Sequence, residues 1–355
     1  MARLPPLATF IVTGFFGAGK TTLLNRLLQD PALADTLVVV NEFGAVGLDH
    51  LLMEKASEGV VLLASGCLCC ALRGELLDTL ADLAARRASG DLPAFTRVII
   101  ETSGLADPGP VMQTILSPAL AGAGYRLHGV VTLVDAVHGP ATLDAEAVSV
   151  AQVAVADRLL LSKDDLAPET AALRGRLAAL NPLAPVFSAA NAAAQTVFAP
   201  REDLMTLPTE APAPAGTTRR LMLGHGARQA QGFACHDAGI GAFALTCAAA
   251  MTPGALETFF DLLTARHGEG LLRIKGLVKV ADDPARPVVV QGVRHVLHPV
   301  ARLPAWPDGR ATTRLVFIGR DLDAAGIEDL FAAFCDEPRL DAPDRAALTD
   351  NPLAW

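Results

Sequence analysis

The sequence has few cysteines and no excess of basic charge. Six cysteines in 355 residues do not resemble the framework of a small disulfide-rich secreted protein. The formal net charge is −9, and no stripe of lysine and arginine runs along the chain. The phosphates of a nucleic acid would therefore be repelled rather than neutralised. We expect no nucleic-acid partner.

Long apolar runs are absent as well. The N-terminus has no positively charged segment followed by an uninterrupted apolar run, and no stretch of about 18 apolar residues occurs in the chain. These absences favour a cytoplasmic protein without a membrane partner. Hydrophobic residues nonetheless make up 51% of the chain, which predicts a well-filled core, and the length suits about two domains.

Residues 14–21 read GFFGAGKT and match the phosphate-binding loop pattern G-x-x-x-x-G-K-[ST]. An apolar, β-branched run at 9–13 precedes the loop and an amphipathic helical pattern follows it, which an ordinary glycine turn would not require. The glycines allow backbone N–H groups to point at phosphate oxygens, and the helix adds its positive end. We expect Lys20 to contact the β- and γ-phosphates and Thr21 to ligate magnesium. The nucleotide-binding residues predicted from this segment are Gly14, Gly17, Ala18, Gly19, Lys20, Thr21 and Thr22.

Apolar runs alternate with helical patterns through the first 190 or so residues, which predicts an α/β fold with a mostly parallel sheet and helices on both faces. Leu72 to Arg87 is expected to form one of these helices, because Leu76, Leu80 and Leu83 recur on one face. The expected strands lie near 9–13, 36–41, 59–63, 96–101, 128–134, 157–161 and 185–187.

Composition divides the chain into two domains. A proline-rich stretch without periodicity at 199–218 is predicted to be a linker between a P-loop domain at 1–198 and a smaller α+β domain at 219–335. Residues 336–355 are expected to form a tail. In the second domain we expect strands near 240–247, 271–280, 286–293 and 313–319, with helices near 253–267 and 324–334.

Two further segments have the features of nucleotide contacts. The apolar strand pattern at 98–100 ends in Glu101 and is followed by Gly104. Glu101 could hold magnesium through water, and Gly104 could offer its N–H to the γ-phosphate, so that hydrolysis would release the loop that follows. A strand that ends in glutamate is common, so this interpretation depends on the phosphate loop that precedes it.

The segment 162–165 reads SKDD after another apolar run, at the place where GTPases carry Asn/Thr-Lys-x-Asp. The Asp165 carboxylate would accept hydrogen bonds from the N1–H and amino group of guanine, a pattern that adenine does not present. Lys163 would lie along the base, and Ser162 replaces the usual Asn or Thr. A solvated turn is the alternative. Asp135, which ends another strand pattern, could belong to the nucleotide pocket or could cap its strand.

Cys67, Cys69 and Cys70 cluster at the start of the expected helix from Leu72. The positive end of a helix lowers thiol pKa values and favours the thiolates that bind metal. Without a second Cys-x-x-Cys pair, three thiolates leave a fourth position for Glu42, a histidine, water or a ligand from a client, and such an open site favours exchange. A reduced or redox-active trio is the alternative.

Taken together, these motifs resemble the CobW-type metallochaperone GTPases, which belong to the SIMIBI class of P-loop proteins. The resemblance covers about residues 7 to 335, and the motifs as a set are highly specific. Besides the phosphate loop, the matching segments are NEFG at 41–44, GCLCC at 66–70, ETSG at 101–104, SKDD at 162–165, LRIKG at 272–276 and VQGVRH at 290–295.

The resemblance implies a GTPase that binds zinc or cobalt at its Cys-x-Cys-Cys motif and delivers the ion to a client metalloprotein or a metal-cofactor biosynthesis enzyme. Lys20, Thr21 and Glu101 would act in GTP hydrolysis with magnesium, and Cys67, Cys69, Cys70 and Glu42 would bind the transferred metal. A nucleotide-dependent homodimer remains an option. A GTP- and metal-responsive binding module without transfer is the main alternative, and a small-molecule kinase is disfavoured by Asp165.

Two departures from the family pattern affect this interpretation. Ala45 stands where the family usually has a glutamate, which removes a carboxylate from the expected switch. Many relatives carry a histidine-rich linker, whereas here only His225 and His236 lie near the linker. We therefore expect no metal storage in this protein.

Overall fold

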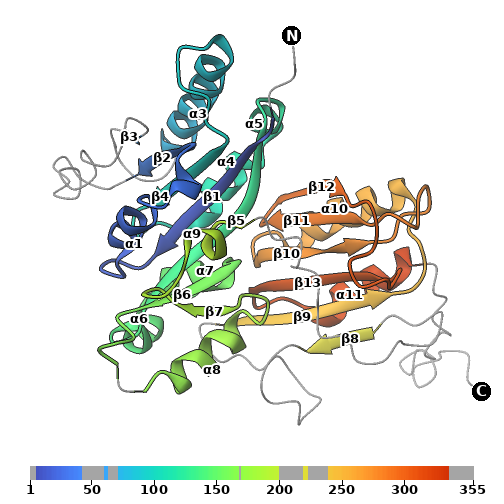
Figure 1. The fold of residues 1–355 in the computed structure, drawn as a ribbon. Coiled ribbons are helices and arrows are strands. Elements are labelled where there is room, and N and C mark those ends of the chain that lie inside the picture. The colour runs from blue at the N-terminus through green and yellow to red at the C-terminus, as the bar shows by residue number, and fades with distance from the viewer. Residues whose placement is uncertain are drawn as a thin grey trace, which may run out of the picture.

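Two β-sheets form the framework of the molecule and lie side by side in the computed structural model (Figure 1). The structure describes residues 5–41, 60–62, 71–167, 169–199, 219–222 and 239–335. The predicted linker, apart from residue 199, and the predicted tail lie outside these residues, and the exact domain limits stay a prediction. No helix among the described residues is long and apolar enough to cross a membrane.

The first sheet confirms the predicted α/β fold. Its seven described strands follow the order β3-β2-β4-β1-β5-β6-β7, and every neighbouring pair is parallel. The strands are β1 (Leu7–Gly14), β2 (Thr36–Asn41), β3 (Val60–Leu62), β4 (Arg97–Thr102), β5 (Tyr125–Asp135), β6 (Arg158–Ser162) and β7 (Val186–Ser188).

Helices connect these strands, as the alternating sequence pattern predicts. The predicted helix from Leu72 is confirmed, with Leu76, Leu80 and Leu83 buried against the sheet. The helical elements are α1 (Lys20–Leu27), the 3₁₀ turn η1 (Pro31–Leu33), α3 (Ala71–Ser89), α4 (Pro108–Ile115), α5 (Pro118–Gly122), α6 (Gly139–Ala145), α7 (Ala147–Ala154), α8 (Ala171–Leu180) and α9 (Ala194–Val197).

The strand order places β1 between β4 and β5, at the point where the chain changes direction across the sheet. After β1 the chain moves outward to β2 and β3, returns to β4, and then crosses to β5. In open α/β sheets, ligands bind beyond the carboxyl ends of the strands at such a position. The loop after β1 and the residues that end β4 therefore lie together at the expected binding edge.

The second sheet is antiparallel, with the order β12-β11-β10-β13-β9-β8. The predicted strands and helices of the smaller domain are confirmed. Two strands were not predicted, β8 and β12, and both lie at edges of the sheet. The elements are β8 (Arg219–Met222), β9 (Ile240–Cys247), α10 (Pro253–His267), β10 (Leu271–Val278), β11 (Val288–Val293), β12 (Val296–Arg302), β13 (Thr313–Arg320) and α11 (Ala324–Phe334).

The second sheet is covered on both faces. Phe243, Leu245 and Cys247 of β9 pack with α10 and α11, whereas Ile240, Ala242 and Ala244 of the same strand join the core of the first domain. This alternation follows the period of two along a strand. The two domains therefore share one apolar core, and Figure 1 shows the second sheet lying against α7 and α8.

A buried ionic cluster lies inside this shared core. Asp157, which precedes β6, accepts a hydrogen bond from the backbone of Val130 at 2.7 Å and one from Lys275 of β10. Arg273 lies 3.5 Å from the same carboxylate, and Asp157 and Arg273 are each 2% exposed. Burial alone would raise the pKa of Asp157, but the charges of Lys275 and Arg273 outweigh it and hold the pKa low.

Candidate nucleotide-binding site

The loop between β1 and α1 has the backbone of a phosphate cradle. Gly14, Gly17 and Gly19 have φ angles of 139°, 77° and 87°, which residues with a side chain rarely adopt. A Cβ atom on Gly14 would lie 2.3 Å from the carbonyl oxygen of Leu133 in β5. The loop can therefore curl over the end of the sheet only because glycine occupies these positions.

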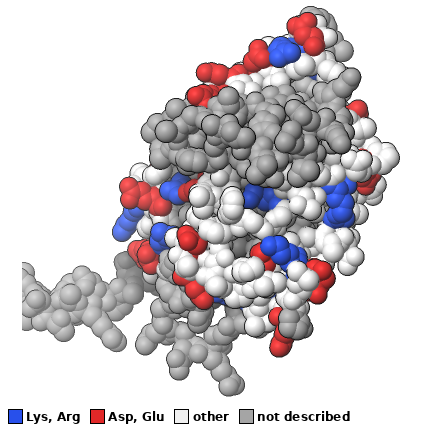
Figure 2. All heavy atoms as spheres, turned by 90° about the vertical axis from the view of Figure 1, so that its left-hand side faces the viewer, with Lys and Arg blue, Asp and Glu red and all other residues white. Residues whose placement is uncertain are grey.

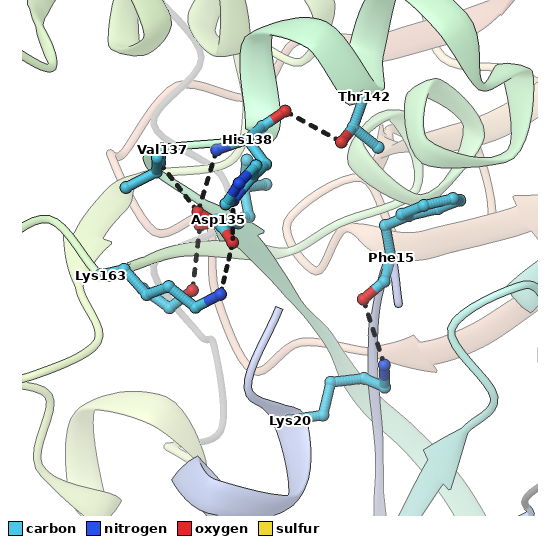
Figure 3. A network of polar contacts seen from close by, with 9 residues as sticks. Phe15, Lys20, Asp135, Val137, His138, Thr142 and Lys163 are labelled. Carbon is cyan, nitrogen blue, oxygen red and sulfur yellow. Dashed lines mark hydrogen bonds and ion pairs between the residues drawn. The ribbon is translucent and has the colours of Figure 1, made fainter. Parts of the chain in front are cut away.

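Lys20, the first residue of α1, extends back over this loop. It is 9% exposed, and its Nζ donates to the carbonyl oxygens of Gly14 at 2.9 Å and Phe15 at 3.4 Å. Figure 3 shows the side chain pointing to Phe15. The ammonium group is thus held within the curl of the loop, where it can neutralise phosphate charge.

Thr21 and Glu101 bring the phosphate loop and β4 together. The Thr21 hydroxyl donates to Glu101 Oε1 at 2.8 Å, and Glu101 is 4% exposed and lies opposite Val12 in the pairing of β1 with β4. A hydroxyl and a carboxylate are the oxygen donors that magnesium uses in phosphate sites. The residues present therefore fit a magnesium ion, with Thr21 and Glu101 as the groups that would hold it.

Gly104 lies directly against the phosphate loop. A Cβ atom at this position would lie 2.6 Å from the backbone nitrogen and Cα of Phe16, so only glycine allows the contact. The carbonyl oxygens of Gly104 and Ala106 accept hydrogen bonds from Gln152 Nε2 at 3.2 and 3.0 Å. Sequence reasoning missed Gln152, although a single amide within the apolar sequence AVSVAQVA of α7 was a signal for a buried polar role.

The predicted base-reading residues follow β6. Ser162 ends the strand, Lys163 has a φ of 56°, and Asp165 is exposed in the turn that follows. Lys163 Nζ donates to Asp135 Oδ2 at 2.6 Å. Asp135 Oδ1 also accepts hydrogen bonds from the backbone N–H groups of Val137 and His138 at 2.8 and 3.1 Å.

Asp135 therefore caps the end of β5 and anchors Lys163, as Figure 3 shows. Partial burial would raise its pKa, but the hydrogen bonds from Lys163, His138 and Val137 lower the pKa to about 2. The carboxylate is ionised at neutral pH and holds the lysine at the edge of the site.

Exposed apolar side chains occur in the same loops, and sequence reasoning did not identify them. Phe16 and Leu105 lie in the phosphate loop and the loop after β4, and they are 75% and 55% exposed. Val137 and Leu166, beside Asp135 and Asp165 in the sequence, are 44% and 67% exposed. Acidic and basic side chains are interspersed on the described part of this side of the molecule (Figure 2).

The predicted metal ligands Glu42, Cys67, Cys69 and Cys70 lie outside the described residues, as does Ala45. The neighbouring elements are described. Asn41 ends β2 and pairs with Thr102 of β4, next to Glu101, and α3 begins at Ala71. The isolated Cys247 and Cys335 are buried in the second domain.

Family models match both halves of the chain. Residues 8–188 match the nucleotide-binding domain of CobW/HypB/UreG, and residues 240–335 match the C-terminal domain of the cobalamin synthesis protein CobW. The first match contains the complete phosphate loop, Glu101 and Asp165. The chain belongs to the CobW family of GTPases.

Curated members of the CobW family align with nearly the whole chain. The zinc chaperone YjiA of Escherichia coli K12 is 33% identical over 331 residues, which cover 92% of this chain and 98% of YjiA. The zinc chaperone CobW of Pseudomonas aeruginosa is 32% identical over 367 residues, which cover 92% and 91% of the two chains. The crystal structure of Zn(II)-bound YjiA GTPase from E. coli superposes with a TM-score of 0.64, at 26% identity and 93% and 99% coverage.

Proposed function

We propose that this CobW-family protein hydrolyses GTP and uses that cycle to bind zinc and release it to a client metalloprotein or a metal-cofactor biosynthesis enzyme. The relatives named zinc chaperones support zinc as the transferred ion, and thiolate ligands would also accept cobalt. The observation that carries the proposal is the position of β2. Asn41, the last residue of β2, pairs with Thr102, the neighbour of the Glu101 that meets Thr21. Glu42 is the next residue in the sequence.

The nucleotide part of the proposal assigns a role to each group at this edge. The backbone N–H groups of residues 14–22 bind phosphate oxygens, Lys20 neutralises the β- and γ-phosphates, and Gly104 donates its N–H to the γ-phosphate. Magnesium, when bound, neutralises the charge that develops on the phosphates. Thr21 would hold that ion directly, and Glu101 would orient its bound water.

Guanine selectivity is assigned to Asp165. Its exposed position in the turn after β6 leaves the carboxylate able to accept from a base that enters between this turn and Asp135. Ser162 ends β6, directly before this turn. Lys163 would lie along the base, and its hydrogen bond to Asp135 at 2.6 Å, which fixes the end of the side chain, supports that role.

The metal part of the proposal places zinc at Cys67, Cys69 and Cys70, with Glu42 as the fourth ligand in the GTP state. The three cysteines precede the first residue of α3, Ala71, and the positive end of a helix favours their thiolate form. Loss of the γ-phosphate would release the loops that begin at Glu42 and Ser103, and Glu42 would leave the zinc. The site would then have an open position for a ligand from the client, and a nucleotide-dependent homodimer could protect it before delivery.

A transfer assay tests the proposal. Purified protein is loaded with ⁶⁷Zn and GTP and mixed with a zinc-free client or a competing chelator, and transfer is followed by mass spectrometry during hydrolysis. We expect transfer that requires GTP turnover and is lost in Cys69→Ala. Cys247→Ala removes a buried thiol of the second domain and should transfer normally. Zinc binding and GTP turnover without transfer would favour the regulatory binding module instead.

A further inference from the structure

An ion pair connects the loop after β4 with the second domain. Asp107, the last residue before α4, accepts a hydrogen bond from Arg294 Nη2 at 2.5 Å. Arg294 lies in the turn between β11 and β12, and 187 positions separate the two residues. The pair therefore links a loop of the nucleotide-binding domain with a hairpin of the C-terminal domain.

The loop that carries Asp107 is fixed at three other points. Gly104 contacts the backbone of Phe16 in the phosphate loop, Gln152 binds the carbonyl oxygens of Gly104 and Ala106, and Asp107 Oδ1 caps α4 by accepting from Gly109 N–H at 2.8 Å. Only Leu105 and Ala106 separate Gly104 from Asp107, so the position of Asp107 is tied closely to that of Gly104.

Arg294 is similarly constrained on its side of the contact. Its φ of 54° is unusual for a residue with a side chain, and its backbone N–H donates to Leu271 of β10 at 3.0 Å. The preceding carbonyl, that of Val293, accepts a hydrogen bond from Gln113 of α4 at 3.4 Å. The hairpin therefore presents the guanidinium to Asp107 from a defined backbone position.

The pair itself contributes little to holding the domains together. Arg294 and Asp107 are 35% and 34% exposed, and ion pairs in such surroundings are weak. The shared apolar core and the buried cluster around Asp157 hold the domains instead. Beside the pair lies an open cavity of about 470 Å³, lined by Leu272, Glu269, Arg320 and Asp321 as well as by the pair. The domains would therefore stay joined without this contact.

We propose that Arg294 is a positioning residue that couples the nucleotide state to the β11–β12 hairpin of the second domain. The inference rests on the proposed GTP cycle. With GTP bound, Gly104 and Asp107 are held in the arrangement that pairs with Arg294; after hydrolysis the loop relaxes and the hairpin is released. Coupling of this kind is reciprocal. If GTP in place of GDP changes the affinity of the hairpin for a client by some factor, the bound client therefore changes the affinity for GTP relative to GDP by that same factor.

The test compares variants of the full-length protein that break the pair from either side. Arg294→Ala removes the cation, whereas Asp107→Asn removes the anion and retains an N-cap for α4. Each should lower kcat for GTP by about two- to fivefold and weaken the affinity for GTP relative to GDP by a similar factor, as expected for a weak pair that forms in the GTP state. The double variant should be no slower than either single variant, and Arg294→Lys should recover most of the activity.

Hydrogen exchange of residues 288–302 gives a readout that a purely structural role would not change. In the unmodified protein, exchange should differ between a non-hydrolysable GTP analogue and GDP. That difference should disappear in Arg294→Ala and Asp107→Asn. Arg302→Ala breaks the 2.9 Å ion pair between the last residue of β12 and Asp282 in the connection before β11, and should keep the difference.

Two negative results are distinguishable. If the unmodified protein neither binds nor hydrolyses GTP, the proposed function is wrong and the coupling falls with it. If it hydrolyses GTP, but kcat and hairpin exchange are the same in Arg294→Ala and Asp107→Asn as in the unmodified protein, the coupling inference alone is wrong.

Discussion

The hydroxyl of Thr21 donates a hydrogen bond to Glu101 at 2.8 Å across 80 positions of the chain. Thr21 belongs to the first turn of α1, and Glu101 lies near the end of β4. The contact exists because β4 is inserted beside β1 in the sheet. It joins the phosphate loop to the segment that continues to Gly104 and Asp107.

Glu101→Gln should slow GTP hydrolysis strongly. The amide oxygen can still accept from Thr21, but the negative charge beside the expected magnesium is lost. We expect kcat to fall by roughly 10²-fold, a typical effect of removing one electrostatic group, with a higher magnesium requirement. Steady-state phosphate release over a magnesium series measures both. The control is Thr102, the next residue of β4, whose hydroxyl donates a buried hydrogen bond to Thr13 of β1. Thr102→Val removes this bond and should retain turnover. An equal loss in both variants would argue against a specific role of Glu101.

Asp165→Asn should change the base that the protein accepts. The carboxylate matches the two donors of guanine, whereas an asparagine can donate to the extra carbonyl of xanthine. We expect kcat/KM for GTP to fall by about 10²-fold and turnover of xanthosine triphosphate to appear. Asp164→Asn alters the neighbouring carboxylate and should keep the GTP preference. Retention of GTP selectivity in Asp165→Asn would show that another residue reads the base.

Asp157→Asn should destabilise the protein because it leaves Lys275 and Arg273 buried without their counter-ion. Breaking a buried ion pair in this way costs roughly 3–5 kcal/mol, which chemical denaturation followed by circular dichroism would measure. The variant should also weaken the docking of the second sheet, since the cations come from β10. Asp282→Asn, at an exposed pair, is the matched control and should leave stability nearly unchanged.

The acid sensitivity of folding should depend on Asp135 and Asp157. Both carboxyl groups have folded-state pKa values below the usual 3.8, and that of Asp135 is about 2. A lowered folded pKa stabilises the native state above the unfolded pKa and loses that contribution as the pH falls through the folded one. We therefore expect the free energy of unfolding to drop between about pH 4 and pH 2. Asp135→Asn should show a shallower drop in this range; an unchanged pH dependence would mean that Lys163 does not stabilise the ionised form.

Local sequence patterns correctly predicted the elements around the candidate nucleotide-binding site. The phosphate loop, the strand that ends near Glu101 and the helix carrying Leu76 and Leu80 are each encoded within a few residues, so periodicity and glycine spacing identify them. β12 was missed because Pro299 interrupts its pattern, and proline is tolerated there only because the strand lies at the edge of the sheet.

Contacts between distant segments could not be predicted from one sequence. Lys275 meets Asp157 across 118 positions, and the direction in which Lys163 points depends on Asp135 at the end of a different strand. In neither pair does the sequence around one residue indicate which residue is its partner. The ligand set around Cys67, Cys69 and Cys70 was predicted from spacing and resemblance, and that prediction is still to be tested.

The most direct test is an anaerobic zinc titration of the protein bound to a non-hydrolysable GTP analogue or to GDP, with a competing chelator to fix the free zinc concentration. We expect one tight site whose affinity is higher with the GTP analogue, and loss of that difference in Glu42→Ala and Cys69→Ala. Equal zinc affinity in the two nucleotide states, or full affinity in Cys69→Ala, would contradict the claim that GTP controls a zinc site at these cysteines.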